Sequence, residues 1–250
     1  MSIFDCQKKS YMVYLLKEVI CKMIKGVVFD LDHTLFDRYA TLTEIAPMMF
    51  EHFKKKISPG LGIEDLAVNL IYADKNYICF GFDEVVKYLN NSGFFRKKIK
   101  TDEFVSVLFE CFMQVAVPFP YTNDVLEKIR SLGYKTGLIT NGSGELQRAK
   151  LKLLGLEKYF DEIIICGELG FEKPDLLSFK TMAELLDASP NQLLYVGDNP
   201  VNDIVPSRKV GYIPVWVKTG SPWLFRNIQK CAFEIDTIEG VFDILDKLKN

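Results

Sequence analysis

Histidine is scarce in this chain: of its 250 residues only His33 and His52 are histidines. This scarcity argues against a histidine-rich zinc centre and against a hydrolase built on a serine and a histidine. Acid and base chemistry must therefore come mainly from carboxylates. Long apolar runs are lacking too, because Lys17 and Glu18 interrupt the apolar stretch 11–16 before it is long enough to cross a bilayer, and no small-residue cleavage site follows.

Neither sign of charge is in excess. The formal net charge is -2 at pH 7, which gives no electrostatic reason to expect nucleic acid or an acidic membrane surface as a partner. Closely paired cysteines are also absent: the six cysteines are spread singly, with no C-x-x-C pair. This pattern is typical of free thiols in a reducing compartment. We expect a cytoplasmic protein with a small-molecule partner, and the sequence leaves its state open between monomer and homodimer.

The pattern of apolar residues changes along the chain. At 25–31 they are consecutive and β-branched, which predicts a strand buried on both faces. A helical pattern with few β-branched runs follows, until Pro118 and Pro120 interrupt it. We therefore expect three parts: an N-terminal extension at 1–24, a catalytic core at 25–37 and 118–250, and a helical cap domain at 38–117.

Beyond Pro120, short apolar runs alternate with helical patterns, as in βαβ units. The expected strands are 135–140, 162–166, 193–197 and 213–217, and the expected helices are 145–154, 175–186, 201–210 and 236–248. Such units build a parallel sheet with helices on its faces. The predicted fold class is α/β, a Rossmann-like parallel sheet core with an all-helical cap inserted after the first strand.

Two acids, Asp30 and Asp32, stand two residues apart where the first strand is expected to end. Carboxylates this close repel each other, and the usual relief is a bound cation or a shared proton. A divalent metal is therefore suspected. A short Asp-x-Asp-x-Thr string is equally compatible with a strand-end turn rich in capping residues, so the other strand ends have to be considered with it.

Reactive groups gather at the carboxyl ends of the strands in open α/β sheets. Here Thr140 and Asn141 follow the second strand, Lys173 lies in the loop after the third, and Asp198 and Asp203 follow the fourth. Each group alone is more often a turn, a cap or the start of a helix. Their occurrence in order on successive elements of one sheet favours a site made of acids, a hydroxyl, an amide and a lysine.

With these four motifs in order between about Gly26 and Val217, the chain resembles the haloacid dehalogenase-like superfamily of hydrolases. The resemblance implies phosphoryl transfer on magnesium through an aspartyl-phosphate. Asp30 would be the nucleophile and a metal ligand. Asp32 would be the general acid and base, with its backbone carbonyl on the metal, and its side chain would need a pKa raised towards neutrality.

The resemblance places the other site residues as well. Asp198 would be the third protein ligand of Mg2+, and Asp203 a supporting acid. Thr140 and Asn141 would bind the phosphoryl oxygens, while Lys173 would hold the nucleophile, offset the charge of the intermediate and contact the phosphate. These residue types suit the chemistry, because the anionic oxygens of a phosphate ester must be neutralised before a carboxylate attacks, and a hard cation with oxygen ligands does this.

The helical insert resembles the caps of family members in which the cap follows the first strand. Such a cap excludes water and largely sets substrate choice. Dehalogenases of the family lack an acid at the position of Asp32, so its presence favours phosphate over halide. We expect a phosphatase of a small soluble phosphomonoester, phosphoglycolate-like or nucleotide-like. A sugar-phosphate mutase and a binding module without turnover remain alternatives, and His33 is given no role.

Overall fold

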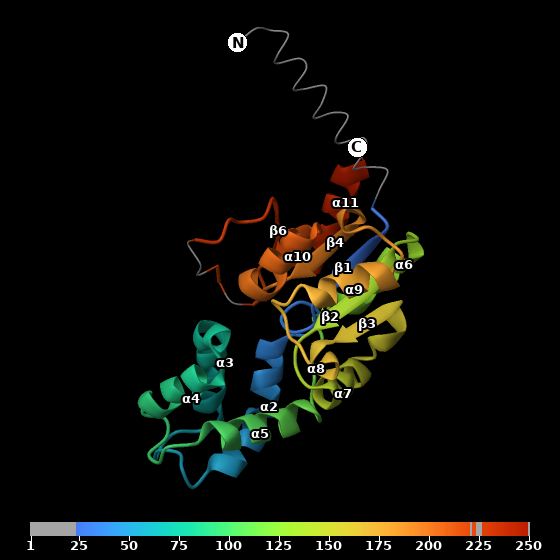
Figure 1. Cartoon of the computed structure of the whole chain (residues 1–250). Coiled ribbons are helices and arrows are strands. Elements are labelled where there is room, and N and C mark those ends of the chain that lie inside the picture. The colour runs from blue at the N-terminus through green and yellow to red at the C-terminus, as the bar shows by residue number, and fades with distance from the viewer. Residues whose placement is uncertain (1–23, 221, 224–226, 250) are drawn as a thin grey trace.

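A computed structural model describes residues 24–220, 222–223 and 227–249. All but the last residue of the expected N-terminal extension at 1–24 lies outside the described residues. The described part of the chain forms a sheet covered by helices, with a separate group of helices beyond one end of the strands (Figure 1). In the described part of the chain, none of the helices has the length and apolar content that a membrane crossing needs.

The sheet is parallel throughout, as expected, and within the described residues it has six strands in the order β3-β2-β1-β4-β5-β6. The strands are β1 (Gly26–Phe29), β2 (Lys135–Thr140), β3 (Glu162–Ile165), β4 (Leu193–Gly197), β5 (Ile213–Val217) and β6 (Phe233–Ile235). Phe29 of β1 pairs with Leu138 of β2 and Val196 of β4. The residues that follow these three strands therefore emerge side by side at one edge.

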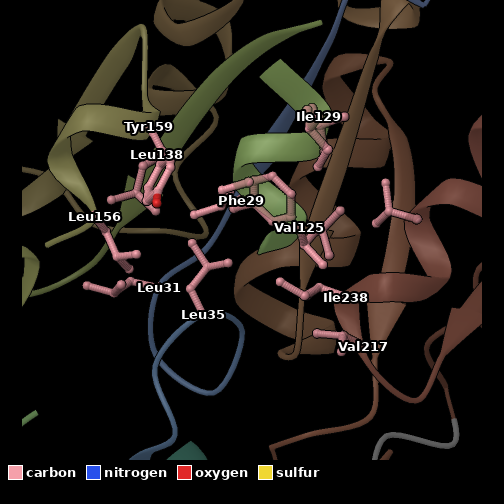
Figure 2. Close-up of a cluster of buried hydrophobic side chains, with 14 of the residues drawn as sticks. Phe29, Leu31, Leu35, Val125, Ile129, Leu138, Leu156, Tyr159, Val217 and Ile238 are labelled. Atoms are coloured by element: carbon pink, nitrogen blue, oxygen red, sulfur yellow. The ribbon is translucent and has the colours of Figure 1, made fainter. Parts of the chain in front are cut away.

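Helices cover both faces of the sheet. On one face lie α6 (Thr122–Ser131), α7 (Gly144–Leu154) and α11 (Val241–Lys249), and on the other lie α9 (Leu177–Leu185) and α10 (Val205–Val210). Side chains of β1 alternate between these faces: Val27 and Phe29 join the first apolar cluster, and Val28 joins the second. Figure 2 shows Phe29 packed with Val125 of α6. Burying one such side chain stabilises the fold by roughly 1.5–3 kcal/mol.

The chain between β1 and β2 forms the helices of an insert. They are α2 (Arg38–Phe53), α3 (Ile63–Tyr77), the short 3-10 turn η1 (Ile78–Phe80), α4 (Phe82–Asn91) and α5 (Thr101–Phe112). These helices bury an apolar core of their own, which includes Leu70, Leu89 and Phe112. Leu146 of α7 also belongs to this core, so α7 joins the insert to the sheet. The division into a core and a cap domain stays a prediction.

Several elements differ from the sequence-based expectation. The stretch 201–210 begins as a π-helical turn (Pro200–Ile204), because the Asn199 side chain accepts from the backbone amides of Val201 and Asn202, and α10 follows it. The closing helix α11 begins only after a 3-10 turn (Ile238–Gly240), later than expected. The first strand and the helix expected at 175–186 are shorter than predicted, at Gly26–Phe29 and Leu177–Leu185. The apolar pattern also does not predict α6, β6 and the four-residue helix α8 (Cys166–Leu169).

Candidate active site

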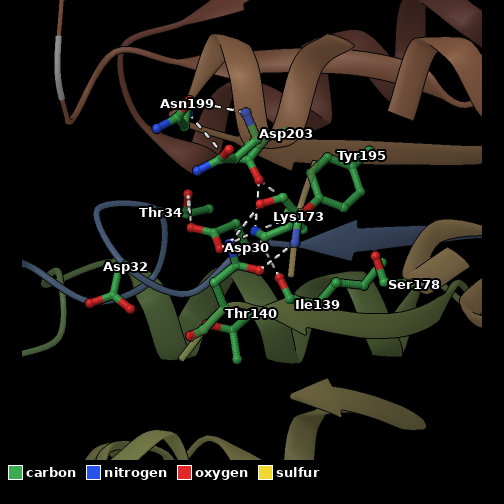
Figure 3. Close-up of polar contacts among 12 residues, drawn as sticks. Asp30, Asp32, Thr34, Ile139, Thr140, Lys173, Ser178, Tyr195, Asn199 and Asp203 are labelled. Carbon is green, nitrogen blue, oxygen red and sulfur yellow. Dashed lines mark hydrogen bonds and ion pairs between the residues drawn. The ribbon is translucent and has the colours of Figure 1, made fainter. Parts of the chain in front are cut away.

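Asp30 stands at the carboxyl end of the central strand β1. Its backbone amide donates to the Val196 carbonyl at 2.9 Å, which continues the pairing of β1 with β4. Its buried carboxylate accepts hydrogen bonds from Lys173 Nζ at 2.6 Å and from Thr34 Oγ1 at 3.3 Å. Each oxygen of Asp30 thus has one protein donor (Figure 3).

Lys173 lies among the acids in the loop that precedes α9. It is 5% exposed, and its ammonium group donates to Asp30 Oδ1 at 2.6 Å, Asp203 Oδ1 at 2.7 Å, the Ile139 carbonyl at 3.1 Å and the Tyr195 hydroxyl at 3.2 Å. Burial alone would lower its pKa, but Asp203 and Asp30 raise the pKa of Lys173 well above its usual value. Lys173 is therefore a buried cation.

The loop that carries Lys173 is fixed by Asn141. The Asn141 amide donates to the Lys173 carbonyl at 3.0 Å, and the Lys173 backbone amide donates to Asn141 Oδ1 at 2.7 Å. The side chain of Asn141 is thus occupied by the loop. Thr140 is 1% exposed, and its hydroxyl accepts from the Gln147 amide of α7. Any contact of Asn141 with a phosphoryl group would therefore use its backbone amide.

Oxygen atoms of Asp30, Asp198 and Asp203 lie within 4.8 Å of one another. Burial raises the pKa of Asp30 to about 7, Lys173 opposes that rise and Asp203 adds to it. Burial, Asp203 and Asp30 also raise the pKa of Asp198 well above its usual value. Among the described residues no donor reaches the Asp198 carboxylate. Three clustered acids with one lysine carry an excess of negative charge, and an oxygen-preferring divalent cation fits such a group.

Asp203 is more fully occupied than the other two acids. Its Oδ1 accepts from Lys173 at 2.7 Å and from the Tyr195 hydroxyl at 3.1 Å, while its Oδ2 accepts from the Asn199 backbone amide at 3.0 Å. These donors hold the carboxylate in place beneath the cluster. The arrangement suits a supporting acid better than a direct metal ligand.

Asp32 has different surroundings. In Figure 3 its carboxylate points away from the group around Asp30, and it accepts hydrogen bonds from Lys150 Nζ at 2.7 Å, Gln147 Nε2 at 3.0 Å and Arg38 Nη1 at 3.5 Å. Burial would raise the pKa of Asp32, but Lys150 and Arg38 outweigh it and hold this pKa below its usual value. The expectation of a raised pKa is therefore wrong for this arrangement, because it did not include the two cations.

All predicted site residues line one cavity of about 230 Å³: Asp30, Asp32, Thr140, Asn141, Lys173, Asp198 and Asp203. Sequence reasoning missed their supporting side chains on helices. Gln147 and Lys150 are three residues apart on one face of α7, and that face meets Asp32. The sequence shows this spacing, but nothing in the sequence indicates that this face of α7 is buried against the loop after β1.

Comparisons with known proteins agree with this geometry. A model of the haloacid dehalogenase-like hydrolases matches residues 27–217. The glyceraldehyde 3-phosphate phosphatase of Methanocaldococcus jannaschii is 33% identical over 236 residues, which are 91% of this chain and 98% of that protein. The phosphoglycolate phosphatase of Neisseria gonorrhoeae is 30% identical over 206 residues, 79% of this chain and 81% of that protein.

The fold also has a close match among solved structures. A magnesium-bound crystal structure of the HAD-hydrolase YfnB from Bacillus subtilis aligns with a TM-score of 0.67 and 18% sequence identity, covering 90% of this chain and 99% of that one.

Proposed function

The chain belongs to the haloacid dehalogenase-like hydrolases, and on that premise we propose that it is a magnesium-dependent phosphatase of a small phosphomonoester, with Asp30 as the nucleophile. The observation that carries the proposal is that Asp30, Asp198 and Asp203 cluster in a single cavity with Lys173, which donates to Asp30 and Asp203. A carboxylate nucleophile, a buried cation and acids that can hold a metal are the groups that phosphoryl transfer to an aspartate uses.

Mg2+ fits the donor set of the site. Asp30 and Asp198 offer carboxylate oxygens, while Asp203 supports the group through Lys173. The family resemblance implies that the backbone carbonyl of Asp32 would be a further ligand. When bound, Mg2+ would neutralise the phosphate oxygens and help to hold the ester for in-line attack. This use of Asp198 accounts for a buried carboxylate that has no donor among the described residues.

The first half of the proposed reaction joins Asp30 to phosphorus. Lys173 and Thr34 hold the two Asp30 oxygens at 2.6 and 3.3 Å, so the carboxylate is oriented before the substrate arrives. As the bond from Asp30 to phosphorus forms, the bond from phosphorus to the ester oxygen breaks, and that oxygen takes a proton from Asp32. Lys173 offsets the negative charge of the aspartyl-phosphate.

The second half hydrolyses the aspartyl-phosphate. Asp32 takes a proton from water, which attacks phosphorus and releases inorganic phosphate from Asp30. Asp32 is ionised where Lys150 and Arg38 hold it, so its charge state suits the base of this half, and its carboxylate must turn towards Asp30 to reach the water. Donating a proton in the first half requires its carboxylate to leave Lys150 and gain a proton. Thr140 and the backbone amides at the start of α7 would bind the phosphoryl oxygens.

The substrate that we propose is a short phosphomonoester, with glyceraldehyde 3-phosphate as the first candidate and phosphoglycolate as the second. The relatives that share most of this chain's length carry these activities. The cavity of about 230 Å³ is smaller than the roughly 300–1,000 Å³ that hold drug-sized ligands, which favours a short substrate over a nucleotide.

A phosphate-release screen with Mg2+ tests the proposal. We expect release from glyceraldehyde 3-phosphate or phosphoglycolate, little from a 5′-nucleotide, and none after chelation of the metal. Asp30→Asn should lower kcat by about a thousandfold or more, because the amide cannot form the intermediate. Asp124→Asn on the exposed surface of α6 is the matched control, and far-ultraviolet circular dichroism checks that both variants fold.

The same screen separates the alternatives. Isomerisation of glucose 1-phosphate without phosphate release would identify a mutase. Binding of phosphate esters without turnover would identify a binding module. Full activity of Asp30→Asn would remove Asp30 as the nucleophile.

A further inference from the structure

Three buried side-chain polar atoms have no hydrogen-bond partner among the described residues: His33 Nδ1, Arg38 Nη2 and the Tyr39 hydroxyl. Leaving such atoms unpaired in a folded protein is unfavourable, so most buried polar groups have partners. All three belong to the short segment 33–39, which runs from the loop after β1 into the first turn of α2. Their concentration at one place indicates that a bound ligand supplies the missing hydrogen-bond partners.

This segment borders the proposed active site. His33 is 5% exposed and Arg38 is 8% exposed, and both line the cavity that contains Asp30 and Lys173. The ring of Tyr39 lies 4.4 Å from the ring of His33, centroid to centroid. His33 and Arg38 thus lie where the part of a substrate that extends from its phosphate would be placed.

Asp74 of α3 fixes the orientation of both cavity residues. His33 Nε2 lies 3.0 Å from Asp74 Oδ1, and Arg38 Nε donates to Asp74 Oδ2 at 2.7 Å. Because a carboxylate only accepts, the hydrogen of the neutral imidazole is on Nε2, and Nδ1 carries a lone pair. Arg38 Nη2 can only donate. The wall therefore presents one acceptor and one donor.

We propose that His33 and Arg38 form a subsite that selects phosphomonoesters with a hydroxyl group and a carbonyl oxygen on neighbouring carbons. The hydroxyl donates to His33 Nδ1, and the carbonyl oxygen accepts from Arg38 Nη2. Glyceraldehyde 3-phosphate carries this pair, glycerol 3-phosphate lacks the carbonyl, and phosphoglycolate lacks the hydroxyl. The proposal rests on the proposed function, which supplies the site for the phosphate.

Three variants separate this subsite from a structural role. In His33→Gln the amide still reaches Asp74, but the acceptor at Nδ1 is lost. In His33→Asn the acceptor is kept near the position of Nδ1, and asparagine tolerates the left-handed backbone at residue 33, where φ is 61°. In Arg38→Lys the positive charge stays near Asp74, but the donor at Nη2 is lost. Glu44→Gln, on the exposed face of α2, is the control.

The measurement is kcat/KM for glyceraldehyde 3-phosphate and glycerol 3-phosphate, each divided by kcat/KM for propyl phosphate, which has neither group. We expect the glyceraldehyde 3-phosphate ratio to fall at least about tenfold in His33→Gln and Arg38→Lys. The glycerol 3-phosphate ratio should fall only in His33→Gln, and His33→Asn should restore part of it. Unchanged ratios, with kcat/KM for all substrates falling together, would show a structural role and overturn the subsite.

A binding measurement keeps this test separate from the proposed function. Without metal and without turnover, glyceraldehyde 3-phosphate should raise the melting temperature of the wild type more than propyl phosphate does, and this difference should shrink in His33→Gln and Arg38→Lys. No phosphate release by the wild type would reject the proposed function while this comparison still decides on the subsite. An equal difference in the wild type and both variants would overturn the subsite.

Discussion

At the scale of single residues, Lys150 stabilises the ionised form of Asp32. Lys150 is 2% exposed, and its ammonium group lies 2.7 Å from Asp32 Oδ1 and over the rings of Phe36 and Phe112, at 4.9 and 5.3 Å from their centroids. Burial lowers the pKa of Lys150, and Asp32 opposes that change. The pair keeps Asp32 ionised, although a general acid must carry a proton when the leaving group departs.

Replacing this lysine should therefore change the pH dependence of the reaction. In Lys150→Met the pKa of Asp32 should rise, because its nearest cation is gone. The first half of the proposed reaction needs protonated Asp32, so activity falls as pH rises above that pKa. Because the wild-type pKa lies below its usual value, the wild type should already be on this descending limb at pH 4, and the limb of Lys150→Met should begin at a higher pH. The measurement is kcat/KM from pH 4 to pH 9 with an alkyl phosphate.

Lys150→Arg is the matched control, since it keeps a positive charge beside Asp32 and should leave the descending limb where the wild type has it. If the descending limb of Lys150→Met lies at the same pH as that of the wild type, Lys150 does not set the proton affinity of Asp32 during turnover.

At the scale of elements, Asp74 docks helix α3 onto the loop after β1. Asp74 is 4% exposed and contacts both His33 and Arg38. Burial would raise its pKa, but Arg38 and His33 outweigh burial and lower the pKa of Asp74. Because the folded-state pKa lies below the unfolded one, this carboxylate stabilises the fold above the unfolded pKa, and the stabilisation is lost as pH falls through the folded pKa.

Asp74→Asn should accordingly lower the free energy of unfolding by about 3 kcal/mol at pH 7, because it leaves Arg38 buried without its closest acid. The difference from the wild type should shrink below about pH 4, where Asp74 of the unfolded chain takes up a proton, and it should disappear once the pH falls below the lowered folded-state pKa. Urea unfolding at pH 7 and pH 3 measures it. Glu64→Gln, on the exposed side of α3, should show neither effect, and a pH-independent difference would contradict the role of the Asp74 charge.

Elements with consecutive apolar residues are the ones that sequence predicted best. Strands β2, β4 and β5 begin and end at the expected residues, because both of their faces are covered and their central positions are apolar or glycine. The edge strand β6 has only three residues, with Glu234 in the middle. It is too short to give a recognisable apolar pattern in the sequence. Helix α6 has only ten residues and seven of them are polar or charged, so it gave little signal against the loops around it.

The candidate site was predictable where it depends on strand ends. Asp30, Thr140 and Asp198 follow neighbouring strands of one parallel sheet, so their meeting follows from topology. Lys150 and Asp74 were not predictable in the same way. They sit on helices, and which helix face meets the loop after β1 depends on packing between the insert and the sheet, which residue spacing does not encode.

At the scale of the whole molecule, ligand binding should stabilise the fold by mass action, because the site joins strand ends that are far apart in sequence. Mg2+ with vanadate, a phosphate mimic, should raise the melting temperature, and a ligand at a hundred times its Kd contributes about 2.7 kcal/mol. Differential scanning calorimetry with each ligand alone and with both together measures this rise.

Asp198→Asn should lose most of this rise, since it removes a proposed metal ligand. Asp124→Asn should keep the rise in melting temperature, because Asp124 lies on the exposed surface of α6. A melting temperature that does not change when Mg2+ and vanadate are added together would count against the proposed metal site.

The central position of β1 also affects how the chain is made. Gly26 pairs with Lys135 on one side and with Leu193 on the other, so β1 gets its second neighbour only after β4 has been synthesised. At about 5–20 residues per second, Val27, Val28 and Phe29 wait many seconds without their partners. The insert helices have mostly local contacts and can fold during that wait. The nascent chain therefore passes through a stage in which the insert helices can be folded while β1, which carries the proposed nucleophile, is still unpaired and prone to aggregate.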